Sequence, residues 1–509
     1  DPIFSKYSRK RANKRKEELL ESSDSIKSNW YRHKEVQKAL SNFFKPGSYW
    51  TNRIENKAPE TPPEPKYRLQ GSGKIDLYRA FVERALRITS NSGRIGYIVK
   101  GTFTSDQPSA ELREELLEHN SIEWIFNFIN REGIFSGVHR SERFSVLLAD
   151  RQNATTPIKC RFYCESVEDW QQQTPDHFEL DIEDIKELSP EEYTFIEPPE
   201  PELGDVFLDI VHGNTKADEL SALDELGQPS QEVNTTEAGE EFILLNEAED
   251  AGAEYIEPGF WQLSDGSYAL PAIEGRMINN LDSFAKEWIS GRGRSAVWDD
   301  TSWNDKRPGP QFLTEVSEVL SRDSIHKGYK VAFMRKGSSV NRRTMIGSLY
   351  RTLPCLDTAY ALPLSSLEDA LLVDGILNSF IMDFQVRTVL GGSTLSWFLI
   401  GQMSYPSSIS SDVADQIRTR VASLNLAAKF WAPEWIYLRE KWNLSKPPSN
   451  YFCVTQENRI ETTAQLNALV AKAYGIDNDD LKNILANDED RLTGFYRVDD
   501  DLPWEERRT

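Results

Sequence analysis

The chain has 509 residues, 39% of them hydrophobic and 28% charged, which is enough for two to four domains at roughly 100–200 residues each. No apolar run reaches the roughly 18 residues of a membrane span, and no signal-peptide pattern opens the sequence, so we expect a cytoplasmic protein without a membrane partner. Four cysteines are too few for a disulfide scaffold. Cys160 and Cys164 are spaced like half a zinc site, but no second ligand pair follows, so we expect strand cysteines and no metal.

Charge is distributed unevenly. The formal net charge of -22 argues against a simple nucleic-acid binder, yet residues 163–259 hold 29 Asp/Glu against two Lys, so the rest of the chain is net positive. Residues 5–16 carry seven Lys/Arg, and residues 322–351 carry eight with one acid. Each basic run is either a solvated face or a contact with the DNA backbone. Three interpretations of the acidic stretch are left open: a solvent-facing excursion, a surface for a partner, and adaptation to a salty cytoplasm.

Helices and strands alternate in the first third of the chain. Residues 1–75 are predicted to form a basic helical segment followed by a Pro/Gly-rich connection. An amphipathic helix is predicted over 76–88, with one apolar side formed by Leu77, Ala80, Phe81, Ala85 and Leu86. The elements predicted after it are a strand at 94–103, a helix at 109–119 and strands at 121–130, 142–150 and 158–165. This order indicates an α/β sheet with an antiparallel edge over 76–165.

The composition and the length of the predicted elements change after residue 165. We interpret residues 166–259 as an acidic insert or linker and residues 260–410, rich in Gly, Trp and short segments, as a second, mixed α+β domain. Its clearest predicted helix spans 369–390. Residues 411–509 are predicted to be a helical region, with helices at 411–431, 463–476 and 479–488.

Two long segments carry a family resemblance: DLYRAFVERALRITSNSGRIGYIVKGTFTSD (76–106) and NSIEWIFNFINREGIFSGVHRSERFSVLLA (120–149). They resemble adenine-N6 DNA methyltransferases, above all the large type IIG restriction–modification methylases and their relatives in phage defence. The similarity continues through LPAIEGRMINNLD (270–282), through Asn341–Thr344 and through residues 377–406. The resemblance implies the TaqI-type order: the C-terminal part of a Rossmann-like methyltransferase sheet, then a target-recognition domain over 260–410, then C-terminal helices.

The sequence also departs from that family. Such enzymes carry a Gly-rich loop for S-adenosyl-L-methionine and a catalytic NPPY/F/W tetrapeptide, and neither occurs here. We therefore expect the C-terminal part of a longer chain, inactive alone. Its partner would be the remainder of its own chain or a companion subunit carrying the catalytic motif; further partners in a phage-defence complex are left open.

The resemblance assigns roles to several residues. Methylating an adenine requires the base to leave the duplex, and a flipped base stacks on aromatic rings. Phe135, in GIFSGVH, matches a stacking position; the alternative is a core Phe between strands. Phe81 matches a ring packed near the adenine of S-adenosyl-L-methionine, with Asp76 and Tyr78 beside it. The alternatives are a core position for Phe81 and a helix cap for Asp76.

Target recognition needs side chains that read base edges, and double-stranded DNA is the expected partner. Arg reads guanine and Asn reads adenine. A Gly/Ser-flanked loop supplies these types as Arg335, Asn341, Arg342 and Arg343, with Ser338, Ser339 and Thr344 as candidate phosphate contacts. A solvated loop is the alternative. The GGST turn at 391–394 would approach another backbone closely or simply break a helix.

Three functions compete on this evidence. The first is the methylase and target-recognition part of a restriction or phage-defence protein. The second is a non-catalytic DNA-binding or complex-assembly subunit with a degenerate methylase fold. The third is a protein-interaction module that uses the acidic stretch as its main surface.

Overall fold

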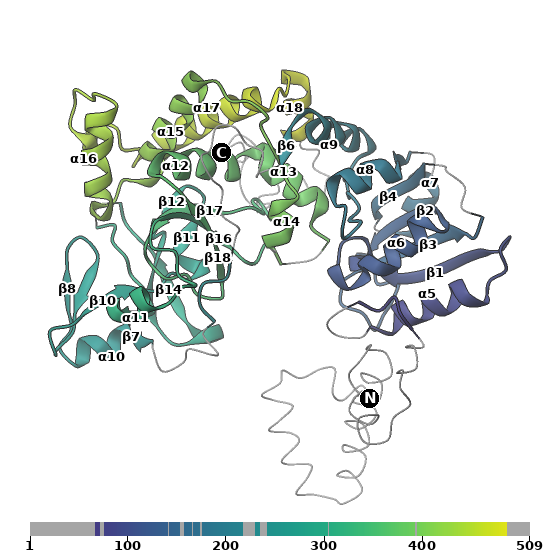
Figure 1. Cartoon of the computed structure of the whole chain (residues 1–509), viewed down its shortest axis with the longest axis horizontal. Helices are drawn as coiled ribbons and strands as arrows, with labels where there is room; N and C mark the ends of the chain where they lie inside the picture. The colour runs from purple at the N-terminus through teal and green to yellow at the C-terminus, as the bar shows by residue number, and fades with distance from the viewer. Residues whose placement is uncertain are drawn as a thin grey trace, which may run out of the picture.

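The computed structural model describes residues 67–71, 76–140, 142–152, 157–164, 166–173, 176–216, 230–234, 242–303, 305–339, 341–391, 394–395 and 397–485. The basic segment at 5–16 lies outside the described residues, as does most of the part expected over 1–75. Two groups of elements stand side by side in Figure 1. One is built around β1 to β4, and the other contains the remaining sheets and the C-terminal helices.

The first group is a five-stranded sheet with helices. In chain order it contains α5 (Leu77–Ile88), β1 (Arg94–Lys100), α6 (Ala110–Glu118), β2 (Ser121–Ile129), β3 (Arg143–Asp150), β4 (Ile158–Cys164) and β5 (Phe178–Leu180). The strand order is β1-β3-β2-β4-β5. β3 runs antiparallel to both β1 and β2, while β4 is parallel to β2 and β5 antiparallel to β4. The mixed α/β class is confirmed.

The antiparallel strand is not confined to the edge that we expected. β3 lies inside the sheet, paired along its length with β1 on one side and β2 on the other. It can occupy an interior position because both of its faces are apolar. Leu147 and Ala149 enter the main core, and Phe144, Val146 and Leu148 join a cluster on the opposite face.

That second face is strongly aromatic. Phe128 stacks on Phe144 with ring centroids 5.1 Å apart, and Trp124 stacks on Phe126 at 4.9 Å. Cross-strand aromatic pairs of this kind stabilise a sheet and fix its register. Cys164 is buried in this cluster, and Cys160 lies on the same strand with its thiol in the main core, as expected for strand cysteines.

The apolar side predicted for the first helix is wrong at two positions. Leu77 and Phe81 of α5 are exposed, whereas Arg79 and Glu83 are buried. Glu83 turns inward because its carboxylate accepts hydrogen bonds from the backbone amides of Arg68 and Leu69, at 2.8 and 3.1 Å. The helix therefore anchors the preceding chain through a carboxylate, and its exposed side is partly apolar.

The acid-rich stretch contains regular structure. Its described elements are α7 (Val167–Gln173), β5, α8 (Ile182–Leu188), α9 (Pro201–Gly213), β6 (Thr215–Lys216), β7 (Ile243–Leu244), α10 (Leu245–Asp250) and β8 (Glu254–Ile256). α9 buries Phe207 and Ile210 in the main core. β6 pairs with a strand near residue 404 and β7 with one near residue 312. Over these described parts the stretch forms secondary structure that packs against other parts of the chain.

The second group contains several small sheets. One sheet has the order β7-β15-β10-β9-β8, with β9 (Phe260–Gln262), β10 (Tyr268–Pro271) and β15 (Phe312–Glu315), and it is followed by α11 (Val316–Ser321). Another has the order β17-β16-β18, with β16 (Tyr329–Met334), β17 (Gly347–Arg351) and β18 (Ala359–Leu364). Two hairpins complete the group: β11 (Ile278–Asn279) with β12 (Asp282–Ser283), and β13 (Lys286–Ser290) with β14 (Val297–Asp300).

Helices dominate the rest of the described chain. They are α12 (Leu367–Leu377), α13 (Phe380–Val389), α14 (Trp397–Gly401), α15 (Ser411–Asn425), α16 (Ala432–Lys441), α17 (Gln456–Tyr474) and α18 (Asn478–Leu485), with β19 (Ser404–Tyr405) before α15. The single helix predicted over 369–390 is wrong, because it is two helices. Asn378 donates its side-chain amide back to the carbonyl of Asp374, and Ser379 begins a new helix by accepting a hydrogen bond from the amide of Met382.

A continuous core joins the two groups. The same buried cluster includes Val82 of α5, Phe207 of α9 and Phe384 of α13, and the last two rings lie 6.2 Å apart edge to face. Described residues on both sides of position 165 therefore share one core, and the domain boundaries inferred from the sequence stay a prediction.

Candidate functional site

One edge of the first sheet gathers most of the predicted site residues. The carboxyl ends of β1, β2 and β4 meet there with the beginning of β3, because β3 runs against its neighbours. Open α/β sheets bind ligands outside the carboxyl ends of their strands. The segment 101–106 after β1 and the loop 130–142 after β2 extend from this edge.

Phe135 lies in the second of these loops. Its ring meets Phe144 edge to face, with centroids 4.8 Å apart, and 36% of the residue is exposed. The alternative of a fully enclosed core Phe is therefore wrong. Asn130, fully buried, fixes the loop: its side chain accepts from the Phe135 amide at 2.9 Å and donates to the carbonyls of Phe135 and Val138. One aromatic ring is thus held at the edge and is open to solvent on one side.

The predicted cofactor residues lie at the start of α5. Phe81 is 58% exposed, so the alternative of a core position is wrong. Tyr78 is half-buried, and its hydroxyl lies 3.0 Å from the Ser109 hydroxyl and 3.4 Å from an Asp106 oxygen. Burial, together with the Asp106 carboxylate, raises the pKa of Tyr78 well above its ordinary value, so the phenol stays protonated. Asp76 occupies the N-cap position of α5 but makes no side-chain capping hydrogen bond, which removes the capping alternative.

The predicted recognition residues occupy the loop between β16 and β17, which we call the recognition loop (residues 335–346). Asn341 and Arg342 are exposed, as is Lys336, whose ammonium donates to the Thr394 hydroxyl at 2.6 Å. Arg335 is half-buried and donates to the carbonyl of Asp357 at 3.1 Å. Arg343 packs over the Phe380 ring, 4.0 Å from its centroid. Asn341 and Arg342 are the two predicted readers that face solvent most openly.

Two predicted phosphate contacts are turned inward. Thr344 is 1% exposed, and its hydroxyl donates to the Ser338 carbonyl at 2.8 Å inside the loop. Ser339 is also buried, and its carbonyl accepts a hydrogen bond from Arg387 at 3.0 Å. The Thr344 hydroxyl is already used inside the loop and Ser339 is buried, so neither side chain is placed to contact a phosphate. Ser338 is half-buried.

The basic stretch 322–351 does not form one surface. Lys330 is completely buried and paired with Glu232 at 2.6 Å, and Arg351 pairs with Glu434 at 2.6 Å. β16 separates the remaining charges into two groups, since a six-residue strand is about 20 Å long. Lys327 lies before the strand, and the recognition loop follows it. The predicted charge of +7 is therefore partly neutralised and split.

Sequence reasoning missed the residues that join the two groups. Arg143 of β3 pairs with buried Glu197 at 2.5 Å and donates hydrogen bonds to the carbonyls of Leu390 and Gly391. A Cβ at Gly391 would fall 1.6 Å from the Ser105 hydroxyl oxygen, so this residue lies close to a side chain of another segment, whereas the backbone approach expected for GGST stays a prediction. The sequence carried one weak signal, an acid at Glu197 directly after the apolar pair Phe195 and Ile196.

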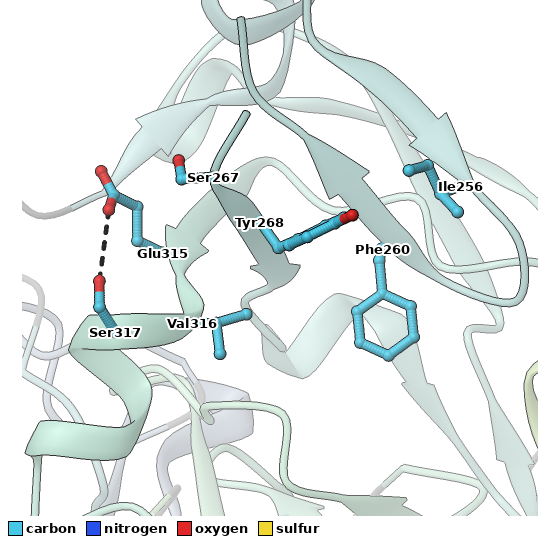
Figure 2. A pocket seen from close by; sticks show the side chains of 7 residues that line it. All are labelled: Ile256, Phe260, Ser267, Tyr268, Glu315, Val316 and Ser317. Atoms are coloured by element: carbon cyan, nitrogen blue, oxygen red, sulfur yellow. Dashed lines mark hydrogen bonds between the residues drawn. The ribbon is translucent and has the colours of Figure 1, made fainter. Parts of the chain in front are cut away.

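A pocket lies apart from these residues. Its volume is about 530 Å³, and it opens on the sheet that contains β9 and β10. Figure 2 shows Phe260, Tyr268, Val316 and Ile256 around it, with Ser267, Glu315 and Ser317 at one side. None of the predicted site residues lines this pocket. In the described parts of the chain, no group of three or more His, Cys, Asp or Glu is arranged to hold a metal ion, and no helix is both long and apolar enough to cross a bilayer.

Part of the chain matches a known protein family. Residues 49–135 match the family of the Eco57I restriction-modification methylase, which confirms the resemblance seen in the sequence. The matched segment includes α5, β1, β2 and the beginning of the Phe135 loop. No curated protein matches the chain.

Two solved restriction–modification enzymes are similar in structure. The type IIL enzyme MmeI, solved in complex with DNA, has a TM-score of 0.43 and 12% identity, covering 81% of this chain and 51% of its own. The type IIG restriction endonuclease BpuSI has a TM-score of 0.27 and 12% identity, covering 84% of this chain and 52% of its own. This chain thus spans about half the length of each.

Proposed function

We propose that this chain is part of a site-specific adenine-N6 DNA methyltransferase of a restriction–modification or phage-defence system. The observation that carries the proposal is Phe135: it ends the segment that matches the methylase family, and it presents a half-open ring at the carboxyl edge of the sheet. A flipped base needs such a stacking surface, which contributes roughly 1–3 kcal/mol per base. Stacking on Phe135 would hold the adenine out of the duplex while its amino group is methylated.

S-adenosyl-L-methionine would supply the methyl group. The exposed ring of Phe81 is accessible to the adenine of such a cofactor, and Tyr78 with Asp106 provides a hydrogen-bonding network one turn away along α5. These groups fit the adenosine end of the cofactor only. The Gly-rich loop and the NPPY/F/W tetrapeptide are absent from this sequence, so other protein must supply both.

A partner carrying those motifs would bind along β1. Among the described residues β1 pairs with β3 alone, so its second edge offers unpaired backbone groups. Ile98 of β1 is exposed, and so are Leu77, Phe81 and Ile88, which share one side of α5. An open strand edge beside exposed apolar residues is typical of a surface that another segment covers. The proposed occupant is the remainder of its own chain or a companion subunit.

Duplex DNA would be read by the recognition loop. Asn341 and Arg342 project into solvent and have the side-chain chemistry to recognise adenine and guanine edges in the major groove. Lys336 is placed to approach a phosphate. The alternative function is a non-catalytic DNA-binding or assembly subunit, for which the same loop would bind DNA without methyl transfer.

The test is transfer of a labelled methyl group from S-adenosyl-L-methionine to duplex DNA by the full-length protein or its reconstituted complex. We expect N6-methyladenine at one sequence, and Phe135→Ala should reduce the rate by about fivefold or more through lost stacking. Val138→Ala, an exposed apolar change in the same loop, is the matched control. DNA binding without methylation would favour the assembly subunit, and neither activity would refute both.

A further inference from the structure

A buried ion pair on α13 holds the recognition loop. Asp383 and Arg387 are one helical turn apart, are both nearly inaccessible to solvent, and pair at 2.5 Å between Oδ2 and Nε. The other Asp383 oxygen accepts hydrogen bonds from the backbone amides of Thr344 and Met345, at 2.8 and 2.7 Å. The side chain of the aspartate thus reaches out of its helix to fix the end of the loop.

Arg387 fixes the middle of the same loop. Its Nη1 donates to the carbonyl of Ser339 at 3.0 Å and its Nη2 to the carbonyl of Arg342 at 2.7 Å. Buried backbone groups need hydrogen-bond partners. Here one ion pair supplies partners for two carbonyls and two amides of the loop, which are not paired with a neighbouring strand. Asn341 lies between the two clamped carbonyls, and Arg342 carries one of them.

The clamp is connected to the first sheet. The helix that carries Asp383 and Arg387 ends at Val389, and the carbonyls of the next two residues, Leu390 and Gly391, accept hydrogen bonds from Arg143 of β3. The position of the loop backbone is therefore fixed relative to the sheet edge where Phe135 lies.

We propose that Asp383 and Arg387 are positioning residues that set DNA sequence choice without touching DNA. The inference rests on the proposed function, because it assumes that Asn341 and Arg342 read bases. Direct readout requires the reading atoms to be held at hydrogen-bond distance, and a bidentate contact discriminates against a wrong base only in the correct orientation. Loosening the clamp should therefore relax sequence choice at the bases read by this loop.

Arg387→Lys is the informative variant. A lysine keeps the positive charge beside Asp383, but its single ammonium lacks the planar fork that bonds the carboxylate and two carbonyls together. The matched control is Arg459→Lys. Arg459, like Arg387, donates to backbone carbonyls. Its acceptors are the carbonyls of Leu424, Cys453 and Leu281, and none of them lies in the recognition loop.

The experiment combines two measurements on the full-length protein. Hydrogen exchange reports whether the amides of Thr344 and Met345 lose protection, and selection from a randomised duplex library reports sequence choice. For Arg387→Lys we expect faster exchange at both amides and about a fivefold or greater loss of discrimination at one or two base pairs. Binding to non-specific DNA should change less than twofold. Arg459→Lys should leave both readouts unchanged.

The outcomes separate this inference from the proposed function. If the wild-type protein selects no sequence, the proposed function fails, and unchanged exchange in Arg387→Lys would additionally refute the clamp. If the wild type selects a sequence and Arg387→Lys selects it equally well, the positioning role is refuted while the function stands. Asp383→Asn provides a second variant that should act in the same direction. Global unfolding of both variants would mark the pair as a stability element only and overturn the proposal.

Discussion

Arg143 donates a hydrogen bond to the carbonyl oxygen of Gly391, 248 residues further along the chain. The same guanidinium pairs with Glu197, whose carboxylate also accepts a hydrogen bond from the Thr104 hydroxyl. Three segments thus meet β3 at this arginine and its partner Glu197: the segment after β1, the acid-rich stretch and the turn after α13. This junction fixes how the recognition loop stands relative to the sheet edge.

Breaking this junction should destabilise the fold. Arg143→Met would leave Glu197, whose side chain is fully buried, without its cationic partner, and such losses cost about 3–5 kcal/mol. Urea unfolding measures the change. Arg94→Met, which removes an exposed pair with Glu123, should cost about 1 kcal/mol or less. Adding Glu197→Gln to Arg143→Met should recover part of the loss; strictly additive effects would show that the two residues do not interact.

Gly391 should not tolerate a side chain. Because a Cβ there would overlap the Ser105 hydroxyl, we expect Gly391→Ala to lower the unfolding free energy by about 1–3 kcal/mol. Thermal unfolding of the purified protein checks this. Gly391→Ala combined with Ser105→Gly removes the colliding atom and should be closer to wild type. Gly401→Ala, where a Cβ meets no atom within 4 Å, is the control, and equal effects at the two glycines would contradict the close approach.

Arg342 and Lys327 should differ in their effect on DNA binding, although both are exposed basic residues of the same stretch. Arg342→Ala removes a loop reader, so we expect binding to the preferred duplex to weaken by about 1–3 kcal/mol. Lys327 lies before β16, at the opposite end of the strand from the recognition loop, so Lys327→Ala should change the affinity for the preferred duplex little. Binding titrations over a salt series measure both. Arg343 is left unchanged because it packs on Phe380. Equal losses for Arg342 and Lys327 would indicate a diffuse electrostatic surface.

Stability should fall as pH rises through the range in which Asp374 titrates. Burial raises its pKa to about 7, although hydrogen bonds from Asn425 and Asn378 oppose the shift. The unfolded carboxyl titrates near 3.9, so the folded state binds the extra proton between about pH 4 and 7. The unfolding free energy of wild type minus that of Asp374→Asn should therefore fall from pH 5 to pH 8, by at most about 1.4 kcal/mol per pH unit. A constant difference would contradict the raised pKa.

Local pattern predicted the first sheet well because its strands and helices are marked by periodicity. Each predicted element between 76 and 165 is present, with ends that differ by a few residues. The order of the strands could not be predicted in the same way, because pairing of β3 with both neighbours depends on contacts far apart in the sequence. The inward turn of Glu83 was also hidden, since its partners are the backbone amides of a preceding segment.

The candidate site was predicted more unevenly. Phe135, Phe81, Asn341 and Arg342 are exposed, in loops or on an open helix side, and the roles that the resemblance assigns to them stay predictions. Lys330, one of the basic residues counted over 322–351, is neutralised by Glu232, 98 residues away, and no local charge count detects such a partner. The clamp was missed although Asp383 and Arg387, spaced one turn apart in a mainly apolar helix, were a readable signal of a buried pair.

The interior position of β3 also orders the events of folding. β2 and β3 are joined by the short connection 130–142 and can pair as soon as both are made, whereas β1 has no described partner until β3 is present. On a ribosome, β1 must therefore wait while some fifty further residues are synthesised. Because contacts between distant residues form more slowly than local ones, the hairpin is the template and β1 joins it late. During that interval β1, with its exposed Ile98, is the strand most in need of protection from aggregation.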